Sequence, residues 1–247
     1  MKTYLLIAAA AVAAGCATMS AEQCASADWS AIGLKDGTNG ETMKMADSRE
    51  AACAKANVTM DRIAYSSGRE QGLVTYCTPQ HAFEIGKVNG RYDGVCADHG
   101  EKEFVYAHNQ GLALAGYKAA IAEAKTKLSD ATLEVASINE TIDGYSNGSI
   151  PFEAEGHNEK LLAIWSKRKY LQTVAIPYWQ AEIKKGEKVI DRYDQRNQFG
   201  GFDPAELRAS QPQGPRAYGG PTEQDAREMV AEVFRNAAAK INKTSAN

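Results

Sequence analysis

Few residues in this sequence could do chemistry, and their spacing gives them no reaction to perform. The histidines lack the HxxxH or HExxH pattern that places two imidazoles on one face of a helix for zinc; they are His81, His99, His108 and His157. Neither the GxGxxG loop of dinucleotide-binding proteins nor a phosphate-binding loop occurs. The sequence therefore predicts no catalytic residue, no metal and no cofactor, and we expect that the protein is not an enzyme.

The cysteines are more informative than the histidines. Cys16 stands near the N-terminus, and the others that follow it are Cys24, Cys53, Cys77 and Cys96. No pair has CxxC spacing, so neither a redox dithiol nor a zinc knuckle is indicated. In an exported chain, an even set of cysteines indicates disulfides, and more than one connectivity can be drawn for this set.

The helices expected around these cysteines favour one connectivity. Helices predicted at 29–38 and 47–56, joined by a tight turn, should lie antiparallel and bring Cys24 close to Cys53. A helix over 61–76 would hold Cys53 and Cys77 roughly 24 Å apart, whereas a disulfide needs Cα atoms within about 7 Å. We therefore favour Cys24–Cys53 with Cys77–Cys96, and the second choice is Cys24–Cys77 with Cys53–Cys96.

The first residues predict export and a lipid anchor. Lys2 precedes an apolar run over residues 4–14, which is typical of a signal peptide and shorter than the ~20 residues of a membrane-spanning helix. The small residues before Cys16 resemble a bacterial lipobox, although Ala13 stands where that motif usually has leucine. We expect cleavage before Cys16, lipidation of this cysteine and, because Ala17 follows it, anchoring at the periplasmic side of the outer membrane. The alternative is an ordinary secreted protein cut at a nearby small residue.

The first half of the chain repeats a short motif of one aromatic residue followed by two glycines. Its copies are Trp29, Gly33, Gly37; Tyr65, Gly68, Gly72; and Phe83, Gly86, Gly90. Because glycine inside a helix costs about 1 kcal/mol relative to alanine, we expect these glycines to let helix backbones approach each other closely. The alternative is a groove that exposes backbone to a ligand.

If such a groove exists, its candidate binding residues are Tyr65, Gly68, Arg69 and Gly72. Arg69 could then bind a carboxylate of an envelope polymer. An ion pair of Arg69 with Glu70 or Asp61 on the helix surface is the simpler interpretation.

The second half of the chain has the heptad pattern of a coiled coil. Apolar residues recur at alternating spacings of three and four; they are Leu114, Tyr117, Ile121, Ala124, Leu128, Ala131, Val135, Ile138, Ile142 and Tyr145. The pattern predicts a helix over about 112–145, covered by a second long helix from about 158 with a kink or break before Pro177. We favour this antiparallel hairpin over pairing of the seam with a second subunit.

These observations predict an all-α protein, with a small disulfide-stapled helical module followed by a long antiparallel helical hairpin. The expected segments are a signal peptide at 1–15, a lipidated tether at 16–27, the glycine-rich module at 28–100, the hairpin at 101–196, a flexible proline- and glycine-rich linker at 197–221, and a C-terminal helix at 222–247.

The motifs of the first half together resemble a known family. Trp29, Gly33 and Gly37, the stretch 65–79 and the stretch 86–96 are similar, in order, to the bacterial lipoprotein family of the domain of unknown function 2799 type. The resemblance covers about residues 22–140 and includes the four later cysteines. It implies an envelope lipoprotein without an established activity, so it transfers no catalytic residue.

The charge of the chain limits its partners. The formal net charge is −3, whereas nucleic-acid binding asks for a basic face, so no nucleic acid is expected. We expect a membrane-anchored binding or scaffolding protein whose hairpin contacts an envelope protein, peptidoglycan or a second copy through the coiled coil. The alternative is a small-ligand binder or enzyme with a groove beside the glycine-rich helices.

Overall fold

The computed structural model describes residues 19–151, 156–196 and 204–244, and every regular element in these ranges is helical. The all-α class is therefore confirmed. The elements are α1 (Ala21–Ala25), α2 (Trp29–Thr38), α3 (Met43–Ala54), α4 (Arg62–Tyr76), α5 (Pro79–Lys87), α6 (Glu101–Asn147), α7 (His157–Tyr170), the π-helical turn η1 (Leu171–Ala175), α8 (Ile176–Arg196), α9 (Pro204–Ala209) and α10 (Glu223–Thr244).

The chain divides into two compact units, with the boundary between Leu112 and Ala113 inside α6. Unit 1 contains α1 to α5 and the start of α6, and unit 2 contains the rest. None of the helices in the described ranges combines the length and the apolar character that crossing a membrane requires.

The helix starts in unit 1 follow from their capping residues. Asp28, Asp61 and Thr78 each accept a hydrogen bond from a backbone N–H of the following helix, at 2.9, 2.9 and 3.3 Å. Such caps satisfy donors that would otherwise have no partner at the helix start. The expected helix starts near residues 29 and 61 are therefore confirmed.

The predicted start of the second helix near Asp47 is wrong. Helix α3 begins at Met43, and Thr42 provides no side-chain cap. Asp47 and Glu50 lie inside α3 and bind the guanidinium of Arg62 in α4. Their carboxylates therefore connect α3 to α4 and do not cap the start of α3.

Residues before α2 are also more ordered than the predicted tether. Ser20 and Gln23 form a capping box that starts α1. Cys24 of α1 is buried in a cluster whose other buried members are Trp29, Ala46, Cys53, Met60 and Tyr65. The tether prediction is thus corrected for residues 21–25, because the Cys24–Cys53 disulfide ties this segment to the core.

Helix α6 starts eleven residues before the predicted position. Its first turns belong to unit 1, where Phe104 and Ala107 are completely buried. Gly111 lies against α5, since a Cβ on Gly111 would be 2.4 Å from the carbonyl oxygen of Phe83. The coiled-coil periodicity could not reveal this part of the helix, because it packs on α5 and not along the hairpin seam.

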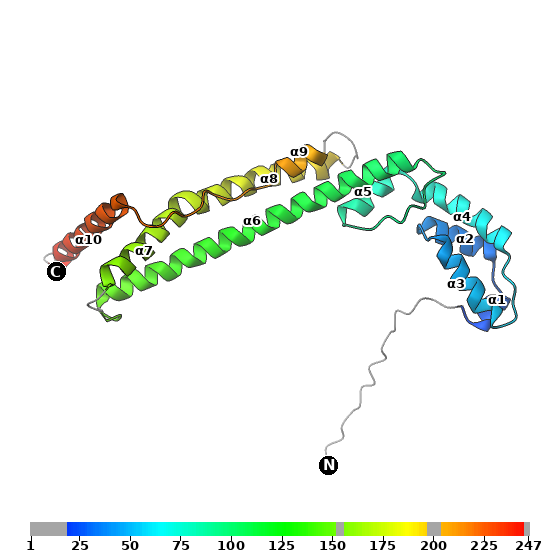
Figure 1. The fold of residues 1–247 in the computed structure, drawn as a ribbon, viewed down its shortest axis with the longest axis horizontal. Helices are drawn as coiled ribbons and strands as arrows, with labels where there is room; N and C mark the ends of the chain where they lie inside the picture. The colour runs from blue at the N-terminus through cyan, green and yellow to red at the C-terminus, as the bar shows by residue number, and fades with distance from the viewer. Residues whose placement is uncertain (1–18, 152–155, 197–203, 245–247) are drawn as a thin grey trace, which may run out of the picture. The chain divides into compact units, whose positions relative to one another are not determined.

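Unit 2 is built on an antiparallel hairpin, as predicted. Helices α7 and α8 run back along α6 (Figure 1), with Ala131 of α6 packed among Leu171 and Ala175. Gly186 lets α8 approach α6 closely, since a Cβ there would lie 2.2 Å from Cδ1 of Ile121. At Ala131 and Ile121, the apolar face of α6 is therefore covered by η1 and α8 of the same chain.

Pro177 does not break the second arm of the hairpin. The turn before it widens to the π-helix η1, in which the N–H of Ile176 donates to the carbonyl of Leu171. Such widened turns accommodate insertions and lost hydrogen bonds within a helix. The predicted break is therefore wrong, and the chain stays helical from α7 to α8 through one π-helical turn.

Candidate functional site

The glycines of α2 and α4 form a backbone-to-backbone crossing, not a groove. A Cβ on Gly33 would lie 2.0 Å from the carbonyl oxygen of Tyr65, and one on Gly68 would lie 2.0 Å from that of Ser30. Gly37 and Gly72 face the opposite backbone at 2.1 and 2.3 Å in the same way. The predicted close approach is confirmed, and no ligand fits between these helices.

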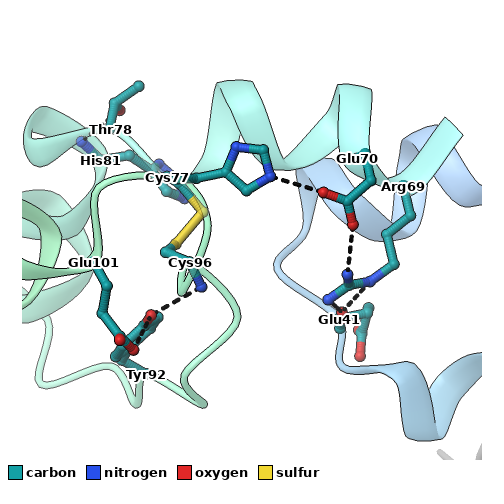
Figure 2. The surroundings of a disulfide bond; sticks show 10 residues. Glu41, Arg69, Glu70, Cys77, Thr78, His81, Tyr92, Cys96 and Glu101 are labelled. Carbon is teal, nitrogen blue, oxygen red and sulfur yellow. Dashed lines mark hydrogen bonds and ion pairs between the residues drawn. A yellow bond between two sulfur atoms is a disulfide. The ribbon is translucent and has the colours of Figure 1, made fainter. Parts of the chain in front are cut away.

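Arg69 is buried beside this crossing and binds the protein's own backbone (Figure 2). Its Nε and Nη2 donate to the carbonyl oxygen of Glu41 at 3.1 and 2.9 Å. The expected ion pair with Glu70 is present but long, at 3.5 Å. Arg69 thus fixes the loop after α2, and its guanidinium does not face an open site.

Sequence reasoning missed the charged network at the centre of unit 1. Arg49 of α3 donates two hydrogen bonds to Asp36 of α2, at 2.7 and 2.8 Å, and Tyr65 of α4 donates a third to the same carboxylate at 2.8 Å. Burial and the hydrogen bond to Asp36 raise the pKa of Tyr65 well above its ordinary value. Three helices are therefore held by one buried carboxylate.

The cysteine pairs form as favoured from the sequence. Cys24–Cys53 and Cys77–Cys96 are disulfides with Cα–Cα distances of 5.4 and 5.6 Å. Figure 2 shows the second bond, where the N–H of Cys96 donates to the hydroxyl of Tyr92 at 2.9 Å. Cys16, the predicted lipidation site, lies outside the described residues.

The histidines of the described ranges serve separate structural contacts. His99 contacts Glu70 at 2.8 Å, and His108 contacts the carbonyl of Gly90 at 2.8 Å. His81 packs edge-on against Tyr76, and His157 against Tyr145. Within the described part of the chain, no group of three acidic, histidine or cysteine side chains is placed to hold a metal ion.

A short match to the serine-nucleophile pattern GxSxG was overlooked at the sequence level. Residues 144–148 fit it, with Ser146 at the nucleophile position. The motif acts in a sharp turn between a strand and a helix, whereas Ser146 lies in the last turns of α6 and donates its hydroxyl to the carbonyl of Ile142 at 2.9 Å. This geometry does not expose an activated hydroxyl.

A hollow of about 480 Å³ lies against α2 in unit 1. Its charged lining residues are Asp28, Lys35, Asp36 and Arg49. Asp28 caps α2, and Asp36 and Arg49 bind each other. Most of its polar groups are therefore already satisfied, and the acidic and basic side chains balance.

In unit 2, an extended segment follows α9 and lies along α7 and α8. We call residues 211–222 the strap. The Tyr178 hydroxyl accepts hydrogen bonds from the N–H groups of Gln213 and Gly214 at 3.1 and 3.0 Å, and the Tyr170 hydroxyl donates to the carbonyl of Arg216 at 2.5 Å. The segment predicted as a linker thus contains helix α9, and in the strap its backbone binds two tyrosine hydroxyls.

The C-terminal helix docks on α7 directly after the strap. Glu232 of α10 accepts hydrogen bonds from Arg168 at 2.7 Å and from the indole of Trp165 at 3.0 Å. Burial by itself would raise the pKa of Glu232, but these two donors outweigh it and lower the pKa. Lys169 adds ion pairs to Asp225 and Glu228 at 2.9 and 2.7 Å.

Between the strap and α7 lies an open pocket of about 470 Å³, which we call the strap pocket. Its lining includes Ser166, Lys169, Tyr170 and Thr173 from α7 and η1, and Arg216 and Tyr218 from the strap. The Ser166 and Tyr218 hydroxyls are hydrogen-bonded at 2.6 Å. Sequence reasoning had no signal for this pocket, since its walls are far apart in the chain.

Residues 28–113 match the family described as protein of unknown function (DUF2799). The match spans α2 to α5 and the beginning of α6, so it coincides with most of unit 1. It confirms the resemblance to the domain of unknown function 2799 over these residues, a shorter stretch than the expected 22–140. The strap and its pocket lie outside the matched residues. Comparison with curated proteins and with solved structures gave no match.

Proposed function

We propose that the protein is a lipid-anchored binding or scaffolding protein of the bacterial cell envelope, without a catalytic role of its own. The signal sequence and Cys16 would place it at the periplasmic side of the outer membrane. Unit 1 would be the disulfide-stapled base next to the anchor, and unit 2 would carry the contact surface.

One observation carries this proposal, namely the difference in polar side chains between the two units. In unit 1, Asp36, Arg49, Tyr65 and Arg69 satisfy one another or the backbone. In unit 2, the strap pocket is open, and it is lined by Arg216, whose guanidinium forms no ion pair within the described residues. A binding role placed in unit 2 therefore has a surface available to it, and the glycine crossing that would have held a ligand in unit 1 is filled by backbone.

Lipidation is tested by growing cells with a labelled fatty acid. The full chain should incorporate the label and fractionate with outer membranes, and Cys16→Ala should lose both properties. Label retained in Cys16→Ala, or none in the parent, would refute the anchor.

The binding role is tested by photocrosslinking in intact cells. A photoreactive amino acid replaces exposed Thr173, which lines the strap pocket, or exposed Leu133 on α6 as the matched control in the same unit. We expect a defined envelope component to be captured from position 173 and not from position 133. The same products from both positions would contradict a binding role at the pocket.

A further inference from the structure

We propose that the strap pocket binds an acidic sugar, with the anionic group on Arg216 and the ring among the tyrosine, serine and threonine hydroxyls. This inference rests on the proposed binding function and names the ligand class for the same site. It derives from three properties of the pocket, namely its charge, its hydroxyl and aromatic lining, and its construction from two separate chain segments.

The charge of the pocket favours an anion. Its ionisable lining residues are Lys169, Arg216 and Asp225. Lys169 already pairs with Asp225 and with Glu228, whereas no ion pair engages the guanidinium of Arg216 within the ranges that the structure describes. The uncommitted charge is therefore positive, and a planar guanidinium forms paired hydrogen bonds with a carboxylate or a phosphate group.

The rest of the lining suits a sugar ring. Tyr170 and Tyr218 are 5.4 Å apart between ring centroids and inclined by 47°, so they offer two differently oriented aromatic faces. The hydroxyls of Thr173 and Tyr170 donate to the carbonyl oxygens of Lys169 and Arg216 at 2.8 and 2.5 Å, so they keep lone pairs that can accept hydrogen bonds from the hydroxyls of a sugar. Aromatic walls with a few placed polar groups are typical of small-ligand pockets, and about 470 Å³ lies within their usual range of ~300–1,000 Å³.

The pocket joins two segments that are distant in sequence. One wall comes from α7 and η1, and the other from the strap around Arg216 and Tyr218. A ligand that contacts both walls binds only the docked strap, so it must also stabilise docking by mass action. This gives a readout that does not depend on the binding measurement itself.

The test uses calorimetric titration of the full-length protein with glucuronate, glucose 6-phosphate and glucose. We expect at least one of the two anionic sugars to bind at least tenfold more tightly than glucose, and the better one identifies the anion as carboxylate or phosphate. Arg216→Gln should abolish the difference, while the matched variant Arg227→Gln, in exposed α10 surface paired with Glu223, should keep it. Hydrogen exchange at residues 211–222 should slow when the better sugar is added.

Three results would overturn the proposal. One is that all three sugars bind equally or none binds. Another is that Arg227→Gln weakens binding as much as Arg216→Gln, which would indicate unspecific charge attraction. Acetate binding as tightly as glucuronate would also reject a sugar site. Capture of an envelope component from position 173 is a separate measurement, so a failed sugar site and a failed binding role give different results.

Discussion

Gly33 of α2 packs directly on the backbone of Tyr65 in α4, so closely that a Cβ atom on Gly33 would lie 2.0 Å from the Tyr65 carbonyl oxygen. The Tyr65 side chain donates to Asp36, one helical turn further along α2, at 2.8 Å. The close crossing and the buried carboxylate therefore depend on each other. If the helices move apart, Asp36 loses a donor as well as its packing.

The first prediction concerns this crossing. Gly33→Ala should lower the free energy of unfolding of unit 1 by about 3 kcal/mol or more, since overpacking alone typically costs ~1–3 kcal/mol and the Tyr65–Asp36 hydrogen bond is also lost. Hydrogen exchange followed by mass spectrometry across a urea series would measure the effect on peptides of α2 and α4.

The same substitution should have the opposite sign at Gly116. This residue is exposed in α6, and a Cβ there would meet only Gln211 Nε2 at 3.8 Å. Helix propensity should then dominate and stabilise unit 2 by up to about 1 kcal/mol. Equal effects of the two variants would mean that the crossing is not tightly packed.

The second prediction concerns the buried ion pair. In Arg49→Met, Asp36, which is only 3% exposed, loses its charged partner. Removing one member of a buried pair costs about 3–5 kcal/mol, so unit 1 should unfold at a clearly lower urea concentration. The control is Arg62→Met, which removes exposed pairs with Asp47 and Glu50 and should change little. A control variant as unstable as Arg49→Met would contradict the special role of Asp36.

Local signals explain what could be read from the sequence. Asp28, Asp61 and Thr78 act within three residues of themselves, so their helix starts need no knowledge of the tertiary fold. The disulfide pairing followed from helix lengths and the reach of a cysteine. The crossing of α2 and α4 followed from glycines whose cost in a helix needs a compensating contact.

Long-range polar contacts explain what could not be read. Asp36 and Arg49 are charged residues on two neighbouring helices, and sequence spacing does not distinguish a buried pair from two solvated side chains. The strap has the composition of a linker, yet Tyr178 and Tyr170 bind its backbone atoms. Because these hydrogen bonds go to backbone atoms, they require no particular side chains in the strap, and its sequence therefore does not reveal them. The strap pocket was therefore invisible, because it exists only once the strap is docked.

The third prediction concerns the docking of α10 and its pH dependence. The pKa values of Glu232 and Asp225 are lowered in the folded protein. Lowered carboxyl pKa values contribute stability above the unfolded values of ~4, and this contribution is lost as the pH falls through the folded values. Docking should thus be intact at neutral pH and weaken below about pH 4. The indole N–H resonance of Trp165, which is bonded to Glu232, would report the release.

Glu232→Gln separates this effect from general acid unfolding. It should weaken docking by about 1–2 kcal/mol at neutral pH, because Arg168 and Trp165 donate to different carboxylate oxygens of Glu232 and glutamine keeps only one acceptor oxygen and no charge. Glu223→Gln is the control, since Glu223 lies on the same helix but its side chain is 81% exposed. A Trp165 resonance that stays unchanged in Glu232→Gln would refute the role of this carboxylate.

The fourth prediction concerns the strap. Tyr178→Phe removes the acceptor for the N–H groups of Gln213 and Gly214 and keeps the ring. Two lost hydrogen bonds should cost about 1–2 kcal/mol, so the strap should open roughly 5- to 30-fold more often. Trypsin cleavage after Arg216 measures this opening, because the protease must bind the strap backbone, whose groups at residues 213, 214 and 216 are bonded to Tyr178 and Tyr170 in the docked strap. Tyr106→Phe, at an exposed position in unit 1, should leave the cleavage rate unchanged. If Tyr178→Phe also leaves it unchanged, the Tyr178 hydroxyl does not hold the strap, and the pocket must then be maintained by Tyr170 and Tyr218 alone.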